Sequence, residues 1–144
     1  MIEINNVTRE RIDKKLLKNL ARHIFKTEKK KRVGLSIALV GEKRMQELNR
    51  KYRSKNRPTD VLSFSKGWRH TGKSPKILTQ DFNEIAVCPA QVRKNAKKFN
   101  STFKKELMRA LIHGILHTLV DDHEKNDIKA KKMFKKQEFY MRIL

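Results

Sequence analysis

Short apolar segments alternate with amphipathic helical patterns along most of this chain of 144 residues. The segment Val33–Val40 is mostly apolar, which is typical of a buried strand. Shorter segments of the same kind occupy Val61–Ser65 and Glu84–Cys88, and residues 1–5 alternate like a short strand. Strands and helices interleave early, and helices dominate late. This order favours an α+β fold (α/β-like), in which a small mixed four-stranded sheet packs with about five helices in a single domain, residues 1–144.

Five segments carry apolar residues at helical spacing. Thr8 is expected to cap the first helix, Pro89 suits the first turn of the third, and Ser101 or Thr102 caps the fourth, which extends to about residue 120. The last helix is expected from about Asn126 to the end of the chain. Its expected buried side consists of Ala130, Met133, Phe134, Tyr140 and Met141.

The net charge predicts the class of partner. The chain has 36 Lys and Arg against 15 Asp and Glu, a formal charge of +21. Such an excess favours a polyanion, with nucleic acid ahead of anionic lipid. The alternative is that the lysine content reflects composition alone. Cys88 is the only cysteine, and the start of the chain lacks the pattern of a signal peptide. No apolar run approaches the 18 or so residues of a membrane span, so we expect a soluble cytoplasmic protein.

Residues 66–82 have no periodicity and are expected to form a loop. Within it, Trp68 stands beside Arg69 and His70, and an aromatic residue beside basic groups can stack on an unpaired base. An exposed loop tip with scattered charge is an equally good interpretation of this segment.

Three of the five histidines lie within eleven residues: His113, His117 and His123. Positions i and i+4 of a helix face the same side, so the first two imidazoles can bind one metal ion. The third follows the expected helix end, where Asp121 and Asp122 can turn the chain back. Three imidazoles leave a fourth position open, as in catalytic zinc sites. The pattern predicts one Zn²⁺ per chain, with nickel or copper also compatible. The alternative is that these histidines are ordinary core or surface residues.

The spacing H-x3-H-x5-H also matches metzincin proteases, but those enzymes need a glutamate directly after the first histidine. Gly114 occupies that position, and Val120 occupies the position of the metzincin glycine. Without a general base, peptide hydrolysis is not favoured.

Two separated motifs resemble the YbeY family of metal-dependent endoribonucleases, and the resemblance extends over about residues 33–144. The first motif begins at Glu47 and reads ELNRKYRSK, and it continues from Pro58 as PTDVLSF. The second begins with Glu106-Leu107 and continues through the three histidines, including HGILH. The chain departs from the family pattern at Val120 and Asp121, where the family has glycine and an aromatic residue, and at Asn83-Glu84, where it has Gly-Asp.

The resemblance implies a small mixed sheet packed with helices and cleavage of single-stranded RNA. It also implies a role in 16S rRNA maturation and ribosome quality control, with the ribosome or its small subunit as partner. By this resemblance, His113, His117 and His123 are the metal ligands, and Arg53 is the functional arginine beside the metal. His113, His117 and Arg53 are then the expected catalytic residues.

General chemistry suggests roles for three of the remaining candidates. Arg53 can clamp a phosphate oxygen and offset charge in the transition state, or it is an ordinary surface arginine. Asp122 can orient a ligand histidine, or it is only a turn residue. Glu106 lies seven residues before His113, hence on the same helix side, and is a second candidate for orienting a ligand.

Two other classes of function remain open. One is a non-catalytic RNA- or ribosome-binding factor with a structural metal site, for which Cys88 is the only thiol available as a fourth ligand. The other is a metal hydrolase that acts on a substrate other than RNA.

Overall fold

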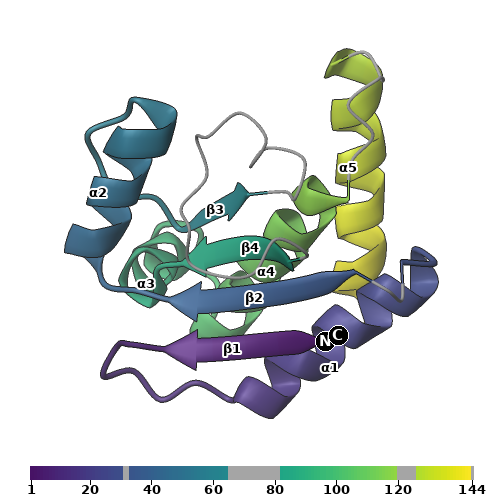
Figure 1. Ribbon diagram of the computed structural model, residues 1–144, viewed down its shortest axis with the longest axis horizontal. Coiled ribbons are helices and arrows are strands. Elements are labelled where there is room, and N and C mark those ends of the chain that lie inside the picture. Colours follow the sequence, from purple (N-terminus) through teal and green to yellow (C-terminus); the bar gives the residue numbers. More distant parts are fainter. Residues whose placement is uncertain (31–32, 65–81, 120–125, 144) are drawn as a thin grey trace.

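The computed structural model describes residues 1–30, 33–64, 82–119 and 126–143. Within these ranges the chain forms four strands and five helices (Figure 1). In chain order they are β1 (Ile2–Asn6), α1 (Lys14–Thr27), β2 (Gly34–Leu39), α2 (Glu42–Arg53), β3 (Val61–Phe64), β4 (Phe82–Val87), α3 (Pro89–Lys98), α4 (Phe103–Thr118) and α5 (Asn126–Arg142). The strand order is β1-β2-β4-β3, with β3 antiparallel to β4 and the other pairs parallel. The predicted mixed four-stranded sheet with five helices is confirmed.

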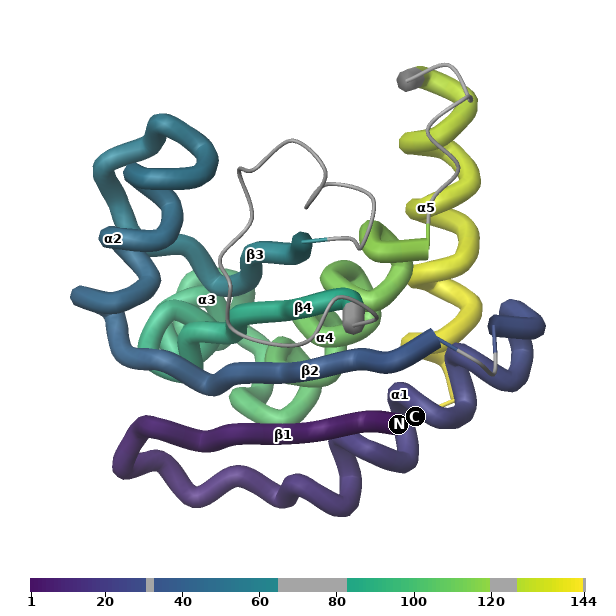
Figure 2. The backbone as a smooth tube through the Cα atoms, in the orientation of Figure 1, coloured from purple at the N-terminus to yellow at the C-terminus, as the bar shows by residue number. Residues whose placement is uncertain are grey.

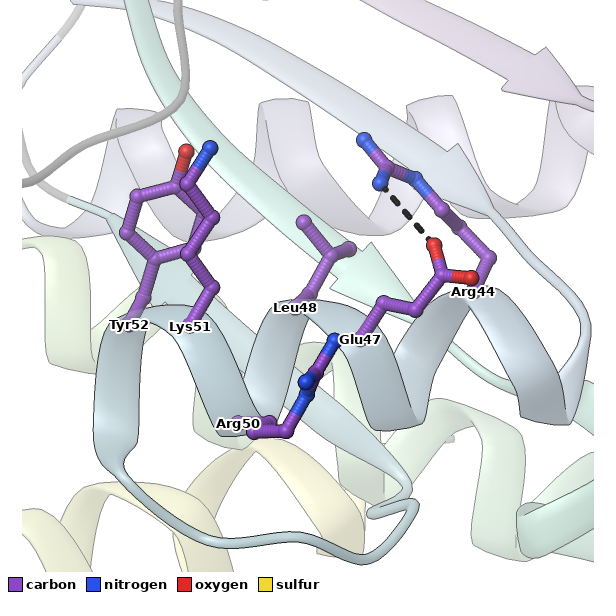
Figure 3. A pocket seen from close by; sticks show the side chains of 6 residues that line it. All are labelled: Arg44, Glu47, Leu48, Arg50, Lys51 and Tyr52. Carbon is purple, nitrogen blue, oxygen red and sulfur yellow. Dashed lines mark hydrogen bonds and ion pairs between the residues drawn. The ribbon is translucent and has the colours of Figure 1, made fainter.

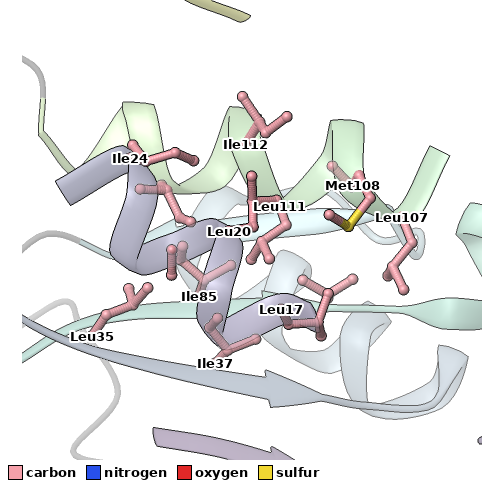
Figure 4. Packing of buried hydrophobic residues seen from close by; sticks show 14 of the residues in the cluster. Leu17, Leu20, Ile24, Leu35, Ile37, Ile85, Leu107, Met108, Leu111 and Ile112 are labelled. Carbon is pink, nitrogen blue, oxygen red and sulfur yellow. The ribbon is translucent and has the colours of Figure 1, made fainter. Parts of the chain in front are cut away.

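The alternation of side chains along the strands divides the apolar residues between the two faces of the sheet. On one face, Ile37 of β2 and Ile85 of β4 pack with the apolar sides of α1 and α4, as Figure 4 shows. On the other face, Ala86 and Leu62 join Met45 of α2 in a smaller cluster. Figures 1 and 2 show α1 and α4 behind the sheet, with α2 at one end of it. The helices that carry the two motifs therefore approach the sheet from opposite faces.

The first helix begins later than its apolar pattern predicts, so the assignment of Thr8 as its cap is wrong. Thr8 accepts a hydrogen bond from the Glu10 amide and donates one to Asn6, which closes a local turn instead. The cap is Asp13, whose carboxylate accepts from the Leu16 amide at 3.1 Å. The segment before α1 is thus held by side-chain hydrogen bonds rather than by a helical ladder.

The buried side of α5 is narrower than predicted. Tyr140 is fully buried and Met133 and Met141 are half-buried, as expected. Ala130 and Phe134 are exposed, however, and Phe134 is 65% exposed. Both residues line a hollow between α5 and the histidine pair of α4 instead of packing into the core. The expectation that these two residues are buried is wrong.

Among the helices of the described ranges, none is both long and apolar enough to cross a membrane. The predicted loop at 66–82, with Trp68, Arg69 and His70, lies almost entirely outside the described residues.

Candidate metal centre and active site

Helix α4 positions the first two candidate ligands. Thr102 caps the helix, since its hydroxyl accepts a hydrogen bond from the Lys105 amide at 3.1 Å, which confirms one of the two predicted caps. The predicted apolar stripe is buried against α1 and the sheet: Leu107, Leu111 and Ile115. His113 and His117 lie beside this stripe, so the same periodicity that buries the leucines places both imidazoles at the edge of the core.

Gly114 lets α4 lie very close to the sheet. A Cβ atom at this position would be 2.9 Å from Cγ2 of Val61 and 3.1 Å from Cγ2 of Ile85, closer than packed carbon atoms tolerate. The absence of a side chain therefore brings the neighbouring His113 against the strands β3 and β4. Gly114, which argued against a protease, is therefore explained by the close packing of α4 on the sheet.

The two histidines form a close pair. Their ring centroids are 4.3 Å apart with an interplanar angle of 64°. His113 is half-buried, and its Nδ1 lies 3.0 Å from Oε1 of Gln137 on α5. An amide oxygen can only accept, so this contact places the proton on Nδ1 and leaves the lone pair on Nε2. That is the tautomer an Nε2 metal ligand requires.

The surroundings of His117 favour its neutral form. Part of its ring is accessible to solvent, yet its pKa is lowered to about 4. Partial burial contributes most because it removes water from the imidazolium, and electrostatic interactions with His113, Lys129 and Arg53 lower the pKa further. Metal binding requires a neutral imidazole, so the low pKa of His117 fits a metal ion at neutral pH.

Arg53 lies at the end of α2 and is fixed against β3. Its Nη2 donates to the Ser63 carbonyl at 2.7 Å, its Nη1 donates to the Tyr52 carbonyl at 3.1 Å, and its guanidinium lies 4.9 Å from the Phe64 ring centroid. Partial burial lowers the pKa of Arg53 from its usual value, and at any physiological pH it remains a cation. Arg53 is therefore not an ordinary surface arginine, because its guanidinium is oriented by two carbonyls and a ring.

The basic segment between α2 and β3 has a defined conformation. Ser54 ends α2 in the left-handed region, with φ of 59°, and buried Asn49 donates to the Arg57 carbonyl at 2.8 Å. At the other end of the segment, the Cys88 amide donates to the Asp60 carbonyl at 2.8 Å. The residues of the first sequence motif thus fold this segment against the sheet.

These parts meet around one cleft of about 810 Å³. The histidine pair and Gly114 form its α4 wall, Arg53 lies on the α2 side, and β3 runs between them. The remaining polar and basic lining includes Asn49, Lys55, Arg57, Asp60, Ser63, Gln91, Asn95 and Lys98. The cleft therefore unites both sequence motifs and presents imidazoles and cations together, an arrangement that suits a phosphodiester.

Three sequence candidates stand apart from this cleft or outside the described residues. His123 and Asp122 lie in 120–125, as do the departures at Val120 and Asp121, which are not described. Within the described ranges no group of three potential metal ligands occurs. Glu106 is bound by the Ser101 hydroxyl and the Arg109 guanidinium, contacts that tie it to the start of α4 rather than to the histidines.

Cys88 is fully buried in the α2-side cluster with Val40, Met45 and Leu62. Burial raises the pKa of its thiol. Its packing gives no support to a closed site of three histidines and one cysteine.

A second hollow, on the outer side of α2, has a different character (Figure 3). It is lined by an exposed Arg44–Glu47 ion pair together with Leu48, Arg50, Lys51 and Tyr52. It brings together no imidazole or thiol, and exposed pairs of this kind contribute little. The candidate catalytic groups line the cleft on the other side of the same helix, where Arg53 lies.

Sequence reasoning missed Gln137, Asn95 and Lys98. Gln137 interrupts the apolar side of α5 between Met133 and Tyr140, and a polar residue inside a buried stripe was the available signal. Asn95 and Lys98 follow from no pattern, because only the packing of α3 beside α4 brings them to the cleft.

Comparisons with known proteins agree with the two motifs. The sequence model described as Endoribonuclease YbeY matches residues 3–144. A protein named Endoribonuclease YbeY from Thermotoga maritima is 42% identical over 129 residues, 88% of this chain and 79% of the relative. One from Thermosipho melanesiensis is 34% identical over 133 residues, 92% of this chain and 88% of the relative.

A solved structure has the same fold. The solution structure of a Thermotoga maritima protein with 39% sequence identity superposes with a TM-score of 0.65 and covers 98% of this chain and 87% of its own. The resemblance predicted from the sequence is confirmed over nearly the whole length, and the chain belongs to the endoribonuclease YbeY family.

Proposed function

We propose that this protein is a zinc-dependent endoribonuclease that cleaves single-stranded RNA in the cytoplasm, in 16S rRNA maturation and ribosome quality control. Its relatives carry the name endoribonuclease. The observation that carries the proposal is the cleft whose lining combines the close histidine pair with the oriented Arg53. The rRNA role is taken from the family resemblance, and the charge of +21 supports a ribosomal partner.

In this proposal His113 and His117 would hold the metal, with His123 as the third ligand. A bound divalent cation supplies a Lewis acid, which polarises a phosphodiester and lowers the pKa of water. Gln137 keeps His113 in the required tautomer. The low pKa of His117 keeps protons from competing for its nitrogen near neutral pH.

Arg53 is proposed to bind a non-bridging phosphate oxygen and to stabilise the additional negative charge of the transition state. Its bonds to the Ser63 and Tyr52 carbonyls hold the guanidinium in place before substrate arrives. Lys55, Arg57 and Lys98 line the same cleft and attract the rest of the strand.

The substrate class is tested with matched oligonucleotides: single-stranded RNA, duplex RNA and single-stranded DNA of one sequence, each with and without chelator. Cleavage is expected for single-stranded RNA alone and is expected to stop with chelator. His117→Ala should abolish it, and His23→Ala, which changes an exposed histidine on α1, should not. RNA binding without cleavage would support the non-catalytic factor instead, and cleavage by His117→Ala at the wild-type rate would indicate a contaminating ribonuclease.

A further inference from the structure

A further hollow, distinct from the one on the outer side of α2, lies beside the histidine pair, on the side of α5. It has a volume of about 430 Å³, and its α5 wall consists of Lys129, Ala130, Met133, Phe134 and Gln137. The histidine pair lines both this hollow and the cleft described above. A strand whose phosphate lies at the pair in the cleft therefore has this hollow as its immediate neighbour.

Phe134 gives the hollow an unusual apolar surface. Its side chain is 65% exposed, and half-buried Met133 lies next to it in the same wall. An exposed aromatic ring beside cationic groups is the arrangement on which unpaired bases stack in proteins that bind single strands. Lys129 is the cation in this hollow, and its positive charge contributes to the lowered pKa of His117.

The helix itself provides a comparison. Phe139 is also exposed, at 51%, but it follows Phe134 by five residues and so points about 140° away around α5. It does not line the hollow. The two phenylalanines are alike in type, helix and exposure, and only Phe134 lies beside the histidines.

We propose that Phe134 and Met133 form a nucleobase-binding subsite, which receives an unpaired base of the RNA strand next to the phosphodiester held at the histidine pair. A planar base fits its apolar wall, and the charge of +21 favours a polyanionic strand over a free apolar ligand. The subsite rests on the proposed function, since it names the group that the same site binds beside the reacting phosphate.

The test measures binding of single-stranded RNA to metal-loaded protein by fluorescence anisotropy, using a 2′-O-methylated oligonucleotide. Phe134→Ala is expected to raise Kd by about 5- to 150-fold, the range that the loss of one stacked base represents. Phe134→Trp should retain the affinity, and Phe139→Ala should leave it unchanged. Thermal unfolding and the bound-metal content should match the wild type in all three variants.

An abasic scan of the oligonucleotide identifies the contact. In the wild type, removal of one particular base should weaken binding by about the same factor as Phe134→Ala, and in Phe134→Ala that removal should cost nothing more. The subsite would be overturned if Phe134→Ala bound the RNA with wild-type affinity, or if Phe134→Ala and Phe139→Ala lost the same affinity. It would also be overturned if the affinity lost in Phe134→Ala added to the loss caused by every abasic position.

Cleavage of unmodified RNA separates the two proposals. Stacking at Phe134 in a protein that never cleaves RNA would overturn the proposed function and leave the subsite standing. Normal cleavage with unchanged KM in Phe134→Ala would overturn the subsite alone, and a wild type that binds no single-stranded RNA would overturn both.

Discussion

Two residues that are not candidate metal ligands, Gln137 and Arg53, act on the histidine pair. Gln137 can accept from the tautomer of His113 that carries its proton on Nδ1, and partial burial lowers the pKa of His117, with a smaller contribution from the charge of Arg53. The i, i+4 spacing alone predicted that the histidines face the same side of a helix. It could not predict Gln137, which is 24 residues distant in sequence and reaches His113 only because α5 packs on α4.

Gln137→Ala should weaken metal binding by about 10- to 100-fold, because loss of a ligand's hydrogen-bond partner frees its tautomer and its ring orientation. Zinc affinity measured by competition with a chromophoric chelator tests this. Lys135→Ala, an exposed change on the same helix, is the control and should bind zinc like the wild type. Equal affinity in Gln137→Ala and Lys135→Ala would contradict the positioning role.

Arg53→Ala should retain its metal and lose kcat by about 10²- to 10³-fold, since it removes a donor oriented toward developing charge. Arg53→Lys should recover only part of the rate because an ammonium group cannot bind a phosphate through two nitrogens at once. Arg50→Ala, at an exposed position of the same helix, controls for lost charge. Undiminished cleavage by a folded Arg53→Ala protein would refute the assigned role.

At the scale of elements, the close packing of α4 on the sheet determines where the histidine pair lies. Helix propensity favours alanine over glycine by up to about 1 kcal/mol, so Gly114 is an unfavourable residue for the interior of α4. Its contacts explain the choice, because Val61 and Ile85 occupy the space that a Cβ would need.

Gly114→Ala should therefore destabilise the fold by about 1–3 kcal/mol, opposite in sign to the propensity effect. Urea unfolding monitored by circular dichroism measures the change. Val61→Ala in the same background should restore part of the loss, since it removes the atom nearest to the new methyl group. An increase in stability on Gly114→Ala alone would show that the close packing carries no cost.

Helix α5 is joined to α1 by a partly buried hydrogen-bond cluster. Glu28, the C-cap of α1, accepts hydrogen bonds from Lys136 and from Tyr140. Burial alone would raise the pKa of Glu28, but these two hydrogen bonds and the nearby lysines outweigh burial and lower it. The cluster fixes the helix that carries Gln137 and Phe134.

Glu28→Gln should cost about 1 kcal/mol at pH 7, because the amide still accepts from Tyr140 but no longer pairs with the charge of Lys136. A lowered pKa in the folded state means that this contribution is present above the unfolded value near 4.5 and is lost as the pH falls through the folded value. Unfolding measured from pH 7 to pH 3 should show the two proteins converging in acid. Glu47→Gln, in an exposed pair, is the control, and a constant difference at every pH would contradict the cluster's role.

The elements themselves were largely predictable, and the errors have local causes. Apolar periodicity located the four strands and five helices of the described ranges because burial dominates their formation. Thr8 was misassigned because its hydroxyl bonds with Asn6 and with the Glu10 amide in a local turn. Phe134 was assigned to the core by its spacing, which does not reveal that this side chain lines a hollow beside the histidines.

At the scale of the whole molecule, the fold brings four parts of the chain to one cleft: the ends of α2 and α4, the basic segment between α2 and β3, and strand β3 itself. Arg53 and His113 are 60 residues apart in sequence, and the fold places both in the lining of this cleft because α2 and α4 reach β3 from opposite faces of the sheet. The charge of +21 predicted a polyanionic partner but could not identify which lysines and arginines line the cleft. Lys98 reaches the cleft only through the packing of α3 on α4.

The central claim is that a metal ion held by the histidine pair drives RNA cleavage in this cleft. Zinc is added stepwise to chelator-treated protein, and bound zinc and the cleavage rate of a labelled single-stranded RNA are measured in the same samples. The account predicts that the rate rises in proportion to bound zinc and levels off at one zinc per chain, and that His117→Ala stays inactive throughout. Full cleavage by metal-free protein, or one bound zinc without any cleavage, would contradict it.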